Sequence, residues 1–124
     1  MNKSKIKDKR PKTAFAKKSF GQNFLVDPNY ISKIISALDP QPDETIIEIG
    51  AGRGALTEKL AQSGARNIAI EFDKDLIPFL REKFENFENL QIVEINALQA
   101  DFDKLAGDDS TRKTKLVANL PYNI

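Results

Sequence analysis

The sequence predicts an α/β fold, in which a parallel β-sheet carries helices on both faces. Short apolar stretches that suit strands alternate along the chain with stretches whose apolar residues have helical spacing. Three alternating glycines, at positions 50, 52 and 54, directly follow the first strand, which is typical of a strand–turn–helix unit that approaches a ligand closely. An acidic residue, Glu71, ends the second predicted strand, at the edge where parallel sheets bind cofactors.

The composition indicates one globular domain. The chain has 124 residues, 40% hydrophobic and 30% charged, and no apolar run reaches the roughly 18 residues that a membrane helix needs. The charged amino terminus has no apolar segment typical of a secretory signal, so we expect a cytoplasmic protein. Cysteine and histidine are absent, which excludes disulfides, Cys/His metal sites and histidine bases. We therefore expect chemistry without a metal, on carboxylates, amides, aromatic groups and a bound cofactor.

Basic residues are concentrated at the amino terminus. Residues 1–20 contain eight Lys or Arg and one Asp, whereas the rest of the chain contains 11 basic and 17 acidic residues. A basic arm on an acidic body suggests a polyanionic partner, but a solubilising tail accounts for the charge equally well. We expect residues 1–16 to be a disordered basic arm and residues 17–124 to belong to the folded domain.

Residues 17–26 combine lysines with aromatic residues. Lys17 and Lys18 could meet phosphates while Phe20 stacks on a base, as in single-stranded RNA binding. Packing of Phe20 and Phe24 onto the domain is the simpler interpretation of these residues alone.

The first predicted helix begins at Asp27-Pro28, since Asp27 suits the N-cap and Pro28 the first helical position. One apolar face follows at the i, i+3, i+4, i+7 spacing, and residues 39–42 end the helix. This face consists of Ile31, Ile34, Ile35 and Leu38.

Strands and helices then alternate. Asp73 or Asp75 is expected to cap the second helix after the glycine turn, with Pro78 in its first turn. If the first and fourth strands are neighbours, the segments after them meet at one edge of the sheet. A doubly wound domain normally has more strands, so we expect a fold truncated after its fourth strand, whose edge is exposed. The predicted strands are 45–49, 67–71, 90–95 and 115–118; the predicted helices are 53–63 and 76–84, with a short helical piece at 98–105 and a loop at 107–114.

The glycine turn predicts a nucleotide-type cofactor site. Glu48 lies two residues before Gly50 and is expected to face the mouth of the turn, where its charge would repel a pyrophosphate but attract the cationic S-adenosylmethionine. Residues 50–55 nevertheless satisfy G-x-G-x-x-G/A, and Glu71 lies 21 positions after the first glycine, so an NAD-binding domain is a serious rival. Glu48, the third glycine Gly54 and the segment after the fourth strand favour the methyl donor.

That segment is Asn119-Leu120-Pro121-Tyr122. The Asn119 side-chain oxygen and a neighbouring backbone carbonyl could both accept from the amine of adenine and localise its lone pair for attack. Pro121 fixes the turn and lacks a competing N–H, and Tyr122 could stack on an extruded base. This chemistry needs no general base, which suits a chain without histidine.

The sequence resembles the small-subunit ribosomal RNA adenine dimethyltransferases (KsgA-like) over residues 17–124. The resemblance rests on residues 18–27 (Lys-Ser-Phe-Gly-Gln-Asn-Phe-Leu-Val-Asp), residues 48–56, Glu71 and residues 119–122. It implies a Rossmann-like S-adenosylmethionine-dependent methyltransferase fold and dimethylation of two adjacent adenosines in a small-subunit ribosomal RNA hairpin loop. It also implies a ribosomal RNA or small-subunit precursor as partner, no membrane, and a monomer at full length.

The resemblance also assigns roles to individual residues. Gln22, Asn23 and Leu25 would close over the methionine part of the cofactor, Glu71 would hold the ribose hydroxyls, and Asn119 would touch both the methionine end and the target amine. Gly50 would line the cradle, and the glycine turn read by itself adds Glu48 and Gly52 as expected cofactor-binding residues.

One position departs from the family pattern, which usually has an aspartate where this chain has Asn96. That aspartate would accept from the cofactor's adenine amine, and a neutral amide forms a bond about half as strong. We therefore expect weaker cofactor binding than is usual for the family.

Three alternatives stay open. The erythromycin-resistance methyltransferases share the fold and chemistry but act on large-subunit RNA. A nicotinamide-dependent dehydrogenase and a non-catalytic RNA-binding factor come from different classes. The fragment alone is expected to be inactive.

Overall fold

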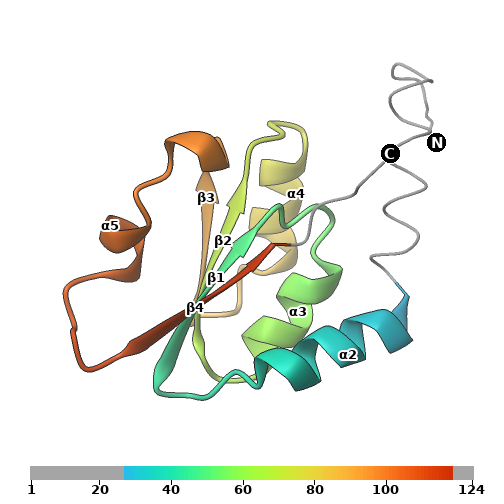
Figure 1. Cartoon of the computed structure of the whole chain (residues 1–124). Coiled ribbons are helices and arrows are strands. Elements are labelled where there is room, and N and C mark those ends of the chain that lie inside the picture. Colours follow the sequence, from blue (N-terminus) through green and yellow to red (C-terminus); the bar gives the residue numbers. More distant parts are fainter. Residues whose placement is uncertain (1–26, 119–124) are drawn as a thin grey trace.

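A computed structural model describes residues 27–118 of the chain, which form one sheet with helices on either side (Figure 1). Strands and helices alternate as the sequence predicts. The elements are α2 (Pro28–Leu38), β1 (Glu44–Ile49), α3 (Ala55–Gln62), β2 (Arg66–Glu71), α4 (Leu76–Lys83), β3 (Leu90–Glu94), the 3₁₀ helix η1 (Ala97–Gln99), α5 (Phe102–Ala106) and β4 (Lys113–Ala118).

The four strands of the described region are parallel and lie in the order β3-β2-β1-β4. The first and fourth strands are therefore neighbours, as the predicted site requires. Ile49, the last residue of β1, pairs with Ala118, the last residue of β4. The chain thus leaves both strands at the same edge of the sheet.

Helices cover both faces of the sheet, which confirms the predicted α/β layering (Figure 1). On one face, α2 and α3 pack through Ile31, Leu56 and Leu60 onto Ile46, and α4 packs through Leu80 onto Ala69. On the other face, α5 and the chain before it cover Ile47, Ile68 and Ile70. Since Ile46 and Ile47 are both 0% exposed, β1 is buried on both faces.

Local sequence signals explain most element boundaries. The Asp27 carboxylate accepts from the Asn29 N–H at 2.9 Å and caps α2, as predicted. Asp75 occupies the N-cap position of α4, one of the two predicted, but its side chain makes no capping hydrogen bond, and the Asp73 carboxylate accepts from the Asp75 N–H. The fourth strand begins at Lys113 rather than Lys115, inside the predicted loop.

No helix between residues 27 and 118 has the length and apolar character needed to cross a membrane.

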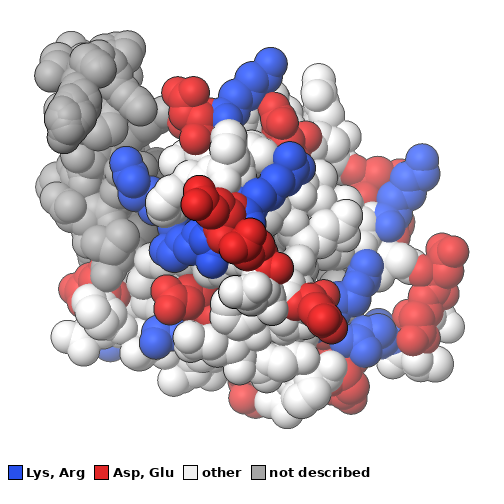
Figure 2. Space-filling model, turned by 180° about the vertical axis from the view of Figure 1, so that it is seen from behind, with Lys and Arg blue, Asp and Glu red and all other residues white. Residues whose placement is uncertain are grey.

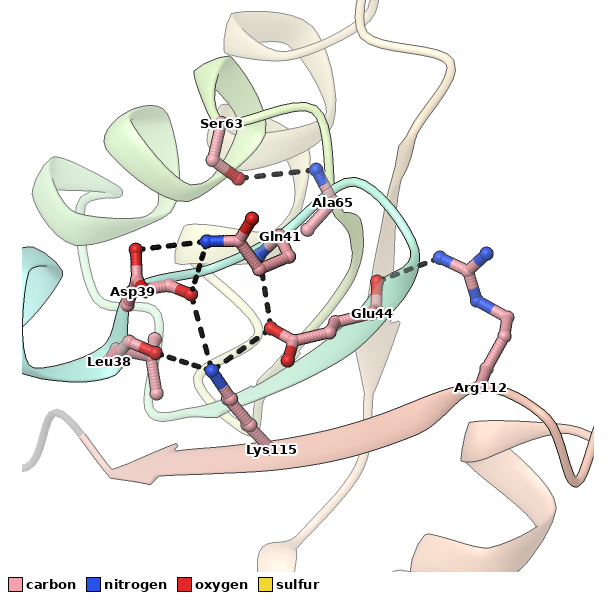
Figure 3. A network of polar contacts seen from close by, with 8 residues as sticks. All are labelled: Leu38, Asp39, Gln41, Glu44, Ser63, Ala65, Arg112 and Lys115. Atoms are coloured by element: carbon pink, nitrogen blue, oxygen red, sulfur yellow. Dashed lines mark hydrogen bonds and ion pairs between the residues drawn. The ribbon is translucent and has the colours of Figure 1, made fainter.

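A polar network joins α2, β1 and β4 at the end of the sheet opposite the glycine turn (Figure 3). Lys115 Nζ lies 3.0 Å from Glu44 Oε1 and donates to the Leu38 carbonyl at 2.7 Å. The Gln41 N–H donates to the same carboxylate oxygen at 3.0 Å, and Arg112 donates to the Glu44 carbonyl at 2.8 Å. The network ties β4 and the residue before it to α2 and the start of β1.

This network predicts a pH-dependent contribution to stability. Burial raises the pKa of Glu44, but hydrogen bonds from Lys115 and the Gln41 N–H, and the Lys115 charge, lower it to below its ordinary value of 4.5. A lowered pKa stabilises the fold at pH values above 4.5, and this contribution is lost as the pH falls through the pKa of the folded protein. Glu44→Gln should therefore reduce the free energy of unfolding at neutral pH and lose this effect in acid.

Urea unfolding of wild type and Glu44→Gln at neutral and acidic pH tests this expectation. Glu88→Gln, which removes an exposed carboxylate elsewhere, is the control for net charge. A stability difference for Glu44→Gln that stays constant with pH would contradict it.

Candidate cofactor site

The glycine turn lies at the carboxyl end of β1 and is held by the neighbouring strand. The N–H groups of Gly50 and Ala51 donate to the Ile70 carbonyl at 2.9 and 3.2 Å, and the Gly54 N–H donates to the Ala51 carbonyl at 3.0 Å. Gly50, Gly52 and Gly54 have φ angles of 80°, 60° and 93°. Other residues adopt such positive angles only with strain, so this sequence of glycines is required by the backbone path.

Two of these glycines have different surroundings. A Cβ built on Gly52 would meet nothing within 4 Å, whereas one on Gly54 would lie 2.7 Å from the Phe84 ring and 3.2 Å from Leu80. Gly52 therefore borders open space at the turn. Gly54 instead permits the close packing of the start of α3 against α4, so its presence has a structural cause and is weak evidence for any one cofactor.

Glu71 joins the glycine turn to the loop after β2. Its Oε1 accepts from the Gly52 N–H at 2.8 Å, and its Oε2 accepts from the N–H groups of Phe72 and Asp73 at 3.1 and 2.9 Å. These bonds hold the carboxylate in one position at the carboxyl edge of the sheet. A carboxylate has about four acceptor positions, so it can still accept from a ribose hydroxyl. That role stays a prediction.

Glu48 does not face solvent at the mouth of the turn, contrary to the sequence-based expectation. Its side chain is 1% exposed, and Oε1 accepts a hydrogen bond from Thr57 Oγ1 at 2.6 Å. Thr57 belongs to the first turn of α3, so the carboxylate lies between β1 and the amino-terminal end of this helix. Helix N-termini stabilise negative charge, which explains how the fold accommodates a buried acid there.

Asn96 follows β3 at the same edge of the sheet and caps η1. Its Oδ1 accepts from the Leu98 N–H at 2.9 Å. The oxygen that was expected to accept from the cofactor's adenine is therefore already engaged in a local bond. The second lone pair of this oxygen can still accept, so weaker cofactor binding through Asn96 stays a prediction.

Two exposed apolar residues flank this edge and were missed from the sequence. Phe72 follows β2 and is 60% exposed, and Leu98 lies after the neighbouring strand β3 and is 93% exposed. Apolar side chains at this edge of the sheet suit a planar base. The sequence did offer a signal for Phe72, because this apolar residue directly follows Glu71 and so lies beyond the buried residues of the strand.

The comparison with known protein families identifies the chain. Residues 14–124 match the family described as "Ribosomal RNA adenine dimethylase". The chain belongs to this family. Two curated relatives, from Hahella chejuensis and Marinobacter nauticus, are both named "Ribosomal RNA small subunit methyltransferase A" and are 47% and 48% identical over 109 residues. The matches cover 88% of this chain but only 39% and 38% of the relatives' lengths.

Solved structures agree with the family assignment. A dimethyladenosine transferase from Plasmodium falciparum is 28% identical with a TM-score of 0.64, over 77% of this chain and 33% of that chain. The 23S rRNA methyltransferase ErmE is 32% identical with a TM-score of 0.57, over 60% of this chain and 31% of that chain. The Rossmann-like methyltransferase fold predicted from the sequence is therefore confirmed.

The structure brings together only part of the site predicted for this adenine dimethylase family member. Glu48, Gly50, Gly52, Glu71 and Asn96 all lie at or beneath the carboxyl edge of the sheet. Within residues 27–118, no group of three or more acidic side chains is placed to hold a metal ion. The remaining predicted residues lie outside the described range: Lys17, Lys18, Phe20, Gln22, Asn23, Leu25, Asn119, Leu120, Pro121 and Tyr122.

Proposed function

We propose that this chain is the cofactor-binding part of an S-adenosylmethionine-dependent enzyme that dimethylates adjacent adenosines of small-subunit ribosomal RNA. The names of the curated relatives support the substrate, and the family assignment supports the adenine amine as the methylated group. The chain spans less than half the length of these relatives, and their activity is carried over to it as a proposal.

The pairing of β1 with β4 is the observation that carries the proposal. Ile49 pairs with Ala118, the glycine turn directly follows Ile49, and Asn119 directly follows Ala118 in the sequence. Consecutive Cα atoms are about 3.8 Å apart, so this register supports a methyl-donor cradle and an amine-binding segment that are neighbours. Strands at opposite ends of the sheet would have separated them.

The residues at the described edge fit S-adenosylmethionine. Gly52 borders open space for a ligand, Glu71 offers acceptor capacity for ribose hydroxyls, and Phe72 and Leu98 offer apolar surface for the adenine ring. The bound cofactor supplies an electrophilic methyl group on a sulfonium. Asn119 and a neighbouring carbonyl would hold the target amine and localise its lone pair, while Tyr122 stacks on the base and Pro121 fixes the segment.

The partner is proposed to be ribosomal RNA in a small-subunit precursor, bound in the cytoplasm by a monomeric enzyme. On the face shown in Figure 2, Lys and Arg side chains lie among Asp and Glu side chains, and no broad basic surface is visible there. This mixed charge offers no rival RNA site on that face, and we keep the sequence-based proposal that Lys17, Lys18 and Phe20 contact the RNA.

Methylation mapping tests the function. The natural gene product and its Asn119→Ala variant are each incubated with unmodified small ribosomal subunits and S-adenosylmethionine, and the RNA is searched for dimethyladenosine. We expect two adjacent dimethylated adenosines with the wild type and a loss of at least about a hundredfold in rate with the variant, since the amine loses an activating acceptor. No methylation of small-subunit RNA by the wild type would refute the proposal.

The likeness to ErmE favours a second candidate, methylation of large-subunit RNA. The same assay with large-subunit RNA distinguishes the two, because only one RNA should be modified. Calorimetric titration with NADH and with S-adenosylmethionine separates the two methyltransferase candidates from the dehydrogenase alternative. A non-catalytic RNA-binding factor would methylate neither RNA.

Asn96→Asp should tighten cofactor binding. A carboxylate can cap η1 with one oxygen, as Asn96 Oδ1 now does for the Leu98 N–H at 2.9 Å, and present the other to the adenine amine. A charge-assisted bond is about twice as strong as a neutral one, so we expect the Kd for S-adenosylmethionine to fall by about tenfold. Calorimetric titration of both proteins measures this, and an unchanged or higher Kd for the variant would contradict it.

A further inference from the structure

We propose that Thr57 is a positioning residue for cofactor binding, because it fixes the Glu48 carboxylate beneath the glycine turn. This inference rests on the proposed binding of S-adenosylmethionine and assigns a role to a residue outside the glycine motif.

The contact between the two residues is short and fully enclosed. Thr57 Oγ1 donates to Glu48 Oε1 at 2.6 Å, and the two residues are 0% and 1% exposed. Water therefore does not compete for this bond, and a charge-assisted bond in a buried place is stronger than a neutral one. The hydroxyl consequently restricts the rotation of the carboxylate.

The two residues lie on either side of the glycine turn. Glu48 belongs to β1 and Thr57 to the first turn of α3, nine residues later, with the turn between them. The bond thus connects the strand before the turn to the helix after it.

Burying Glu48 costs free energy, which the Thr57 bond and the amino-terminal end of α3 offset. A buried carboxylate is expensive unless it is hydrogen-bonded, and an apolar residue of similar size would fill this place in the core more favourably. The same face of β1 carries the apolar Ile46 two residues earlier. A fixed anion beneath the cradle instead suits a ligand whose methionine end carries positive charge. The Thr57 hydroxyl keeps that anion in position before the ligand arrives.

Two ligands distinguish a role of Thr57 in positioning Glu48 from a general role in the stability of the fold. S-adenosylmethionine carries the charged methionine end, whereas 5′-methylthioadenosine has the same adenosine part without it. In the 124-residue chain, Thr57→Val removes the hydroxyl with little change in shape, and Thr57→Ser keeps it. Thr45→Val is the matched control, because Thr45 is also 0% exposed in β1 but bonds to Arg66 and Arg112 at the other end of the strand.

We expect Thr57→Val to raise the Kd for S-adenosylmethionine by about tenfold or more and to leave the Kd for 5′-methylthioadenosine within about twofold. Thr57→Ser should restore wild-type affinity, and Thr45→Val should lower the melting temperature without changing either Kd. Equal weakening for both ligands, or no weakening, would overturn the role of Thr57 while the proposed function stands. Failure of the wild type to bind S-adenosylmethionine would overturn both.

Discussion

Gly54→Ala is expected to be the most destabilising single-methyl substitution in the glycine turn. The added Cβ would lie 2.7 Å from the Phe84 ring, which is 4% exposed and has little freedom to move. Gly54 also has a φ angle of 93°, where a side chain adds strain. Overpacking costs about 1–3 kcal/mol and the left-handed backbone about 1–2 kcal/mol, so the free energy of unfolding should fall by about 2–5 kcal/mol.

Gly64→Ala is the matched control for this prediction. Gly64 has a similar φ angle of 87°, but a Cβ there would meet nothing within 4 Å. Gly64→Ala should therefore lower the free energy of unfolding only by the backbone strain, about 1–2 kcal/mol. Urea unfolding measures both variants, and equal losses would show that Phe84 yields to the new methyl group. Adding Phe84→Leu to Gly54→Ala should reduce the difference, since the smaller side chain removes the clash.

The contrast between Gly52 and Gly54 shows what the sequence could not predict about the site. The motif places three glycines in the turn, and all three have positive φ angles. Only the packing of α3 against α4 reveals that Gly54 is required by Phe84, which lies thirty residues further along the chain. Likewise, Thr57 looks like an ordinary helix residue in the sequence. Its bond to Glu48 depends on how the turn folds back, which periodicity does not encode.

The fold itself was largely predictable, because buried parallel strands are continuous apolar runs. The stretch 45–49 becomes β1 with one residue added, and the alternation of strands and helices determines the layers. The error at β4 has a physical cause. Lys113 and Thr114 are polar yet pair with Glu44 and Thr45 of β1, because an edge strand need not be apolar along its whole length. The helix after the turn starts at Ala55 rather than Arg53, since the positive φ angle of Gly54 interrupts helical geometry.

Glu71→Ala should have the largest effect on cofactor binding. The substitution removes three hydrogen bonds to backbone N–H groups, of which that to Gly52 at 2.8 Å fixes the glycine turn relative to β2. It also removes the proposed acceptor for the ribose hydroxyls. A hydrogen bond to a charged group contributes about 1.5–3 kcal/mol, so losing the ribose contact and the ordered turn together should raise the Kd for S-adenosylmethionine by at least about a hundredfold.

Glu94→Ala is the control for this effect, because Glu94 pairs with Glu71 in the register between β2 and β3 and is exposed. It removes a carboxylate from the same level of the sheet without touching the glycine turn, and its Kd should stay within about twofold of wild type. Glu71→Gln separates the two roles of Glu71. An amide still offers one acceptor oxygen but cannot accept all three N–H groups, so its Kd should lie between those of wild type and Glu71→Ala. If Glu71→Ala bound as tightly as Glu94→Ala, the ribose contact would be absent and the cofactor would have to be held by another part of this edge.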